Sequence, residues 1–139
     1  MITSNLERNL AISSLCKYII STNEKIRSVI SLNKNGRMIE SEFSYDQIIP
    51  KMSKSETEML YMQRTLQTSL SMEFDNLLGP LNYMIFERET MFEFIFPFSE
   101  GVLFVTSDLD IIPRYLSKKI LFILNDFDWR SKNLICKNA

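Results

Sequence analysis

The sequence contains no histidine, only three glycines and only two cysteines among its 139 residues. Histidine is the commonest general base and the commonest metal ligand, so its absence removes both at once. The glycines are isolated from one another, which excludes a glycine-rich phosphate-binding loop. Cys16 and Cys136 lie near opposite ends of the chain without metal-ligand spacing, and we interpret them as reduced cytosolic thiols. We therefore predict no catalytic, cofactor or metal site, and we expect that the protein is not an enzyme.

The sequence also lacks a charge excess and a long apolar run. Sixteen basic and seventeen acidic residues nearly cancel, so no broad field attracts nucleic acid or an anionic membrane. No basic stripe with interleaved aromatic residues indicates a site for single-stranded nucleic acid. Glu7 and Arg8 interrupt the N-terminal segment, and we expect neither a signal peptide nor a membrane span. These features predict a cytoplasmic protein with neither nucleic acid nor membrane as a partner.

What the chain does have is a dense apolar segment between Leu81 and Ser107. Its pattern predicts three antiparallel strands joined by short turns, Leu81–Glu87, Met91–Phe96 and Val102–Ser107. A strand with one face in water carries a polar residue at every second position. The second strand breaks its apolar pattern only at Glu93, and the third runs apolar from Val102 to Val105. Such strands require cover on both faces, which the amphipathic segments before and after can supply.

A hairpin is predicted nearer the N-terminus. Ile26–Leu32 and Arg37–Ser44 flank the sequence Asn-Lys-Asn-Gly at residues 33–36, and Asn-Gly favours the positive φ angles of tight turns. In the second of these strands Glu40 and Glu42 alternate with apolar and small residues. We interpret it as a half-exposed edge strand on which the acidic pair discourages stray strand pairing.

Two further segments have helical periodicity. Asn5 to about Thr22 carries a wide apolar stripe that includes Leu6 and Leu10. The longest helix is predicted from Ser53 to Leu78, with Ser53 or Ser55 as its N-cap, a capping-box match at Ser55-x-x-Glu58 and a stop at Gly-Pro. Its apolar face is formed by Met59, Met62, Leu66, Leu70 and Leu77. This face either packs on the sheet or serves in part as a docking surface, since methionine is over-used at adaptable binding surfaces.

A last helix is predicted to begin at an N-cap formed by Asp108 or Asp110 and to run to about Asn125. We divide the chain into a domain of residues 1–125 and a C-terminal tail of residues 126–139. The tail contains Phe127 and Trp129, which either pack against the domain or form a short aromatic peptide that binds elsewhere.

The order helix, hairpin, long helix, three-strand meander, helix resembles the roadblock or longin type of profilin-like domain. Residues 74–98 (FDNLLGPLNYMIFERETMFEFIFPF) and 100–108 (EGVLFVTSD), with residues 27–43, are also similar to a family of small archaeal roadblock-like proteins to which no biochemical role is assigned. The resemblance implies a single α+β domain with element order α-β-β-α-β-β-β-α. It also implies a five-stranded antiparallel sheet in the order 2-1-5-4-3 with helices on both faces.

The resemblance implies a function as well. Roadblock domains commonly pair through the third strand and the long helix, and the paired surface is a scaffold for small GTPases or other partners. Carried over to this chain, it implies a non-enzymatic dimer, formed with itself or with a related chain. The implied interface residues are Met59, Met62, Leu66, Leu70, Leu81, Tyr83 and Ile85. An uncovered apolar third strand supports this modestly, because it would be an aggregation hazard unless paired.

Two other functions have some support in the sequence. A small-molecule sensor would bind its ligand in an apolar pocket between sheet and helix, lined by Phe92, Phe94, Phe96 and Phe104, although these residues fill a core more simply. An enzyme would use a cysteine nucleophile or the carboxylate pair Asp108 and Asp110, but no histidine can activate a thiol. The scaffold hypothesis is therefore preferred.

Overall fold

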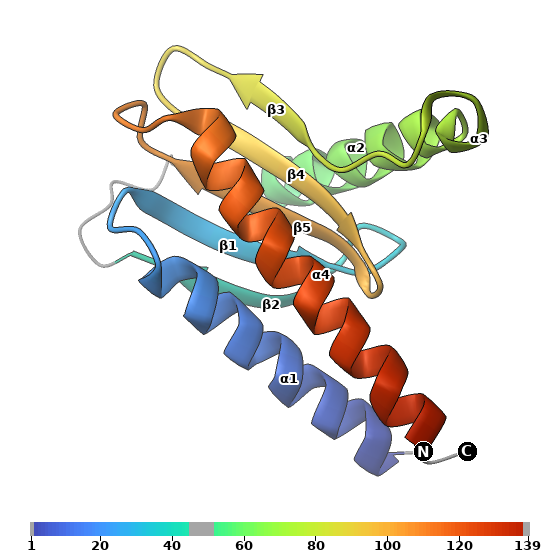
Figure 1. Ribbon diagram of the computed structural model, residues 1–139. Coiled ribbons are helices and arrows are strands. Elements are labelled where there is room, and N and C mark those ends of the chain that lie inside the picture. The colour runs from blue at the N-terminus through green and yellow to red at the C-terminus, as the bar shows by residue number, and fades with distance from the viewer. Residues whose placement is uncertain (1, 45–51, 138–139) are drawn as a thin grey trace.

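The computed structural model describes residues 2–44 and 52–137, with the side chains of residues 5–44 and 52–131. The helices and strands follow one another in the predicted order, with one short helix added before the meander (Figure 1). Their bounds are α1 Ile2–Ser21, β1 Ile26–Leu32, β2 Met38–Phe43, α2 Lys54–Met72, α3 Asp75–Leu78, β3 Met84–Glu87, β4 Phe92–Phe98, β5 Gly101–Ser107 and α4 Pro113–Lys137.

The strands form one antiparallel sheet in the order β2-β1-β5-β4-β3. On one face α1 packs against β1 and β2, and α4 packs against β4; α2 crosses the other face against β4 and β5 (Figure 1). The predicted fold, an α+β domain of the profilin-like type with helices on both faces of the sheet, is confirmed.

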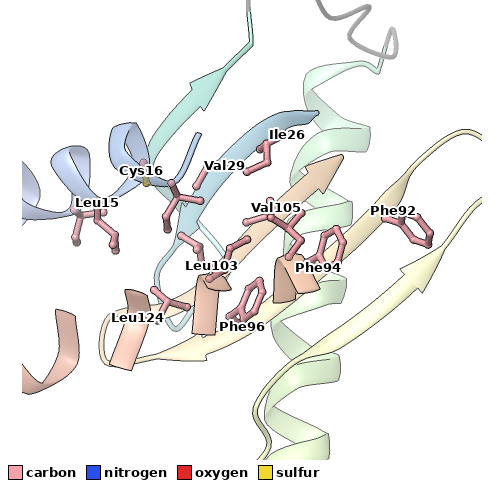
Figure 2. Close-up of a cluster of buried hydrophobic side chains, with 14 residues drawn as sticks. Leu15, Cys16, Ile26, Val29, Phe92, Phe94, Phe96, Leu103, Val105 and Leu124 are labelled. Carbon is pink, nitrogen blue, oxygen red and sulfur yellow. The ribbon is translucent and has the colours of Figure 1, made fainter. Parts of the chain in front are cut away.

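Each face of the sheet has its own apolar core. The larger cluster lies between the sheet and the α1–α4 layer, with Cys16 near Val29 and Leu103 near the ring of Phe96 (Figure 2). The smaller cluster lies beneath α2 and consists of Ile30, Leu32, Ile95, Val102 and Phe104. Because both faces are covered, apolar residues at successive positions of β4 and β5 are buried, as the apolar patterns of the two strands predicted.

The predicted hairpin between β1 and β2 is confirmed. The side-chain oxygen of Asn33 accepts hydrogen bonds from the backbone N–H groups of Asn35 and Arg37, at 2.9 and 3.0 Å. Gly36 takes a φ of +79°, and a Cβ there would lie 3.0 Å from the Cα of Met62. The turn therefore touches α2 as well as reversing the chain.

The end of the long helix differs from the prediction, and the structure decides between its two candidate caps. Ser53, rather than Ser55, is the N-cap: its hydroxyl accepts from the N–H of Glu56, and the Glu56 carboxylate accepts from the N–H of Ser53, each at 3.1 Å. The helix ends at Met72 instead of Leu78, and the remaining residues form the separate α3. Both serines match the capping pattern, so sequence alone did not distinguish them.

The prediction for α1 is wrong in part. Leu6 and Leu10 are 58% and 60% exposed, whereas Ile12, Cys16 and Ile19 form the buried side. At 100° per residue Leu6 and Leu10 are turned away from this buried side. The apolar stripe was therefore drawn too wide, because only part of it faces the sheet.

The last helix continues past its predicted end near Asn125 to Lys137, and that predicted end is wrong. The segment contains no glycine or proline to stop the helix. Phe127 is half-buried and its ring centroid lies 6.1 Å from that of Phe98, so this part of the predicted tail packs against the domain. Trp129 is 64% exposed. Whether residues 126–139 act as a unit of their own stays a prediction.

We predict that Gly101→Ala destabilises the protein more than Gly79→Ala does. Both glycines have a positive φ, of 144° and 89°, so each substitution strains the backbone by about 1–2 kcal/mol. Only at Gly101 would the new Cβ also meet another atom, the carbonyl oxygen of Leu32, at 2.2 Å. Urea unfolding should show about 2 kcal/mol more destabilisation for Gly101→Ala. Equal losses for the two variants would contradict this close approach of β5 to the β1–β2 turn.

Candidate functional site

The fully buried positions of α2 are polar, although Leu60 and Tyr61 also pack against the smaller core cluster. These positions are Arg64, Thr65 and Thr68. The threonine hydroxyls donate to backbone carbonyls one turn earlier in the helix, those of Tyr61 and Arg64, at 2.9 and 2.8 Å. These hydroxyls therefore need no partner in the sheet, and the methyl groups of the threonines are free to pack.

Arg64 joins α2 to the sheet through a buried ion pair with Glu93 of β4. The Nε–Oε1 and Nη2–Oε2 distances are 2.8 and 3.2 Å, and the two side chains are only 6% and 3% exposed. The guanidinium carbon lies 4.5 Å from the ring centroid of Phe86 on β3, a cation–π contact. Arg88, which follows β3, also donates to Glu93. The one break in the apolar pattern of β4 is thus where helix and sheet are joined.

The ionised form of Glu93 is stabilised by Arg64 and Arg88. Burial alone raises the pKa of its carboxyl, because the ionised form loses water. The hydrogen bonds and positive charges of Arg64 and Arg88 favour the ionised form more strongly, and the pKa ends below its ordinary value. Glu93 is therefore a carboxylate at neutral pH, and the pair is charged.

The opposite side of α2 is apolar and exposed. Met59, Met62, Leu66 and Leu70, which we call the outer stripe, have exposed fractions between 51% and 59%. At 100° per residue Met59, Leu66 and Leu70 lie opposite the buried residues of α2, and Met62 lies at the margin of this side, next to Thr65. Contiguous exposed apolar groups mark binding surfaces more often than isolated ones do. Of the two predictions made for this face, packing on the sheet is wrong for these four residues.

The predicted interface residues near β3 are arranged differently. Leu81 and Tyr83 precede the strand, which begins at Met84, and both are half-buried; the Tyr83 ring lies 5.8 Å from that of Phe96. Ile85 is 38% exposed and pairs with Phe94, so it faces the α1–α4 side. Within one chain the outer stripe and Ile85 therefore lie on opposite faces of the sheet.

The short helix α3 adds apolar surface beyond the outer stripe. Leu77 and Leu78 are each 82% exposed, and Phe74 at its N-cap is 55% exposed. The predicted helix ran through Leu78 and placed Leu77 on the same apolar face as the four residues of the outer stripe. The only sequence signal for a protruding corner is the Gly-Pro pair that directly follows the two leucines.

Where the structure describes them, the groups considered for chemistry are buried or near a cation. Burial raises the pKa of the Cys16 thiol to about 12, with a further contribution from the carboxylates of Glu40 and Glu42. Asp108, a predicted helix cap, instead accepts from Arg27 at 2.7 Å, and Asp110 lies 3.7 Å from Lys25. Cys136 lies outside the described side chains.

Neither a metal cluster nor a membrane-spanning helix is found among the described residues. Within them, no group of three or more acidic or cysteine side chains could hold a metal ion. No helix in the described part of the chain has both the length and the apolar character needed to cross a bilayer.

Solved structures with this architecture identify the fold. A roadblock/LC7 domain from Streptomyces avermitilis matches with a TM-score of 0.62 at 11% identity, over 82% of this chain and 92% of that one. The gliding protein MglB from Thermus thermophilus matches with a TM-score of 0.63 at 12% identity, over 89% and 90%. This chain has the roadblock/LC7 fold. MglB from Myxococcus xanthus matches with a TM-score of 0.62 at 18% identity, over 86% and 89%.

The sequence comparisons add no relative. No protein-family model matches the chain, and no curated protein matches it in sequence. At identities of 11–18%, the structural matches establish the roadblock/LC7 fold and leave function to be inferred from the surface.

We predict that Glu93→Gln lowers stability by about 3–5 kcal/mol at neutral pH, because it leaves the buried charge of Arg64 without its counter-ion. The pKa of Glu93 is lowered in the folded state, so the stability that it contributes is present above the unfolded-state pKa and is lost as the pH falls through the folded value. Urea unfolding at pH 7 and near pH 3 should therefore show the difference between wild type and variant shrinking in acid.

The matched control is Glu89→Gln, which makes the same change on an exposed turn residue. It should alter stability by less than about 0.5 kcal/mol at either pH. A Glu93→Gln variant as stable as this control at neutral pH would show that the ion pair does not hold α2 to the sheet.

Proposed function

We propose that this protein is a non-enzymatic scaffold that forms a dimer through the outer stripe of α2 and the open edge of β3. The observation that carries the proposal is the orientation of α2, which buries Arg64, Thr65 and Thr68 while four large apolar side chains point to solvent. A helix in this orientation loses the hydrophobic gain of its apolar side unless another surface covers it.

The geometry of a symmetric dimer supports the same proposal. β3 has β4 as its only strand neighbour in the described sheet, so its outer edge has free backbone groups. In a twofold dimer the same patch meets itself, and edge-to-edge pairing of two β3 strands joins two sheets into one. Such pairing also brings together the residues near β3 from both chains, Leu81, Tyr83 and Ile85, which one chain alone does not place beside the outer stripe.

The roadblock resemblance implies a partner for the paired surface. We propose a small GTPase, or another cytoplasmic protein that binds the same face, and we include in this proposal the cytoplasmic location and archaeal source that the sequence suggests. The alternative of a small-molecule sensor required an apolar pocket lined by Phe92, Phe94, Phe96 and Phe104. These side chains are at most 5% exposed and belong to the two core clusters, which favours the scaffold.

We predict that the wild type is a dimer at micromolar concentration and that Leu66→Asp and Ile85→Asp are folded monomers. A charge at the centre of an apolar interface should weaken pairing by about a hundredfold or more. Light scattering after size exclusion measures the mass. The matched control is Leu10→Asp on α1, since Leu10 and Leu66 are exposed to 60% and 59% and lie on opposite layers. A monomeric wild type, or a Leu10→Asp variant that dissociates as readily, would overturn the assignment of the interface.

We also predict that the dimer binds a small GTPase from the same genome and that Leu66→Asp does not. Surface plasmon resonance with each GTPase, loaded with GDP or with a non-hydrolysable GTP analogue, measures this. A preference for one nucleotide state is expected, because the switch regions of small GTPases change with the γ-phosphate. No binding in either state, across all candidates, would remove the GTPase from the proposal and leave the dimer to be judged separately.

A further inference from the structure

The sheet has a second open edge at β2, which pairs only with β1 among the described strands (Figure 1). The backbone N–H of Ser44 donates to the carbonyl of Arg27 on the β1 side at 2.9 Å. In an antiparallel ladder the bonded residues alternate. The N–H and C=O groups of Ser41 and Phe43 therefore point away from β1, toward the open edge.

An apolar groove lies beside this edge, on the side of β2 that faces α2. Its volume is about 890 Å³, which falls in the range of cavities that bind side chains and small ligands. Side chains of the strand and of the turn before it line one side of the groove, and Met52 with the first half of α2 lines the other. The apolar part is formed by Met38, Phe43, Met52, Tyr61 and Met62 beside Ser41, and Arg37, Lys54 and Glu58 are the charged side chains of the lining.

The other side of β2 is acidic. Glu40 and Glu42 pair with Ser31 and Val29 of β1, so their side chains lie on the α1 side of the sheet. Within the described side chains neither carboxylate forms an ion pair, and Lys17 of α1 is exposed and pairs with neither. The edge therefore has two unneutralised negative charges, spaced two residues apart on one face.

This charge pattern selects what can occupy the edge. Two copies of β2 paired antiparallel about a twofold axis at Ser41 would place Glu40 of each directly opposite Glu42 of the other. Like charges directly opposite one another destabilise strand pairing. A strand with a cation at every second position would instead meet both carboxylates. The acidic pair thus opposes self-association at β2 and favours a basic extended segment.

We propose that β2 binds an extended segment of a partner protein as a sixth strand, and that basic and apolar residues alternate in this segment. Its backbone pairs with Ser41 and Phe43, its apolar side chains enter the groove beside α2, and its basic side chains meet Glu40 and Glu42. Strand addition of this kind takes affinity from main-chain hydrogen bonds and specificity from alternate side chains. The pairing edge is distinct from that of the proposed dimer, because β2 and β3 are at opposite edges of the sheet, although Met62 lines both the groove and the outer stripe.

Fluorescence anisotropy with two labelled peptides tests the charge requirement. One peptide alternates lysine with valine, and the other alternates glutamate with valine. Wild type should bind the lysine peptide at least about tenfold more tightly, which corresponds to a modest net electrostatic preference. The double variant Glu40→Lys/Glu42→Lys should reverse the order. Equal binding of the two peptides, or no binding of the lysine peptide at millimolar concentration, would overturn the proposal.

The backbone requirement is tested at Ser41. Ser41→Pro removes an N–H that points to the open edge and leaves the bonds to β1 in place, since proline is tolerated on edge strands. Binding of the lysine peptide should weaken by about tenfold, whereas Ser41→Ala should bind as wild type does. A lysine peptide N-methylated along the pairing edge needs no change in the protein and should also bind about tenfold less well. Undiminished binding of this methylated peptide would exclude strand addition.

The Leu66→Asp variant separates this site from the proposed scaffold function. It should lose dimerisation and keep the affinity of wild type for the lysine peptide, because Leu66 lies outside the groove. Loss of peptide binding in folded Leu66→Asp would place the peptide on the outer stripe and overturn the assignment to β2.

Discussion

The buried ion pair between Arg64 and Glu93 sets the orientation of α2, and the accessible surface of the protein depends on that orientation. A rotation of α2 that buried its methionines and leucines would take Arg64 away from Glu93 and leave Arg88, whose side chain is 55% exposed, as the remaining cation of this pair. Removing one partner of a buried ion pair costs several kcal/mol, which is comparable to the gain from burying two or three apolar side chains. Replacing such a pair by apolar residues is often neutral for stability. The Arg64–Glu93 pair therefore mainly determines which side of α2 faces the sheet.

The two edges of the sheet are protected differently. β3 is short, with two exposed residues among its four, and it follows a corner of exposed leucines. β2 has carboxylates at alternate positions on one face and a groove on the other. An apolar edge strand can pair with the same strand of a second molecule. An acidic edge strand is repelled by the same strand of a second molecule and is attracted to a positively charged one. One sheet can in this way support self-association at one end and selective binding at the other.

Much of the fold was predictable from sequence because its signals are local. The Asn-Gly turn, the period-two strands and the Gly-Pro stop each lie within a few residues, and the roadblock resemblance supplied the strand order. The facing of α2 was not predictable. Periodicity locates an apolar stripe but does not say whether the stripe is buried, and the deciding contact joins residues 29 positions apart. Glu93 was the available signal, since a lone acidic residue in a buried strand requires a partner.

The sequence likewise predicted those parts of the candidate site that depend on local spacing and missed those that depend on distant contacts. Met59, Met62, Leu66 and Leu70 were identified from helical spacing, and the structure places all four on one exposed stripe. Leu81 and Tyr83 were assigned to a strand that begins only at Met84. An extended apolar segment has the same sequence pattern whether or not it pairs with a neighbouring strand. The groove at β2 depends on a turn approaching a distant helix, which no local pattern encodes.

The central pairing of β1 with β5 has a consequence for how the protein is made. The buried hydrogen bond between Ser28 and Thr106 joins positions 78 residues apart, and β5 is the last strand of the described sheet. During synthesis β1 leaves the ribosome long before β5, its partner at the centre of the sheet, has been made. Until then Ile30 and Leu32 of β1 lack the core that covers them in the folded domain. Pairing of such high contact order is slow, and transiently uncovered apolar strands invite aggregation. The middle of the sheet can form only after β5 has emerged, so folding of the domain is delayed until most of it has been synthesised.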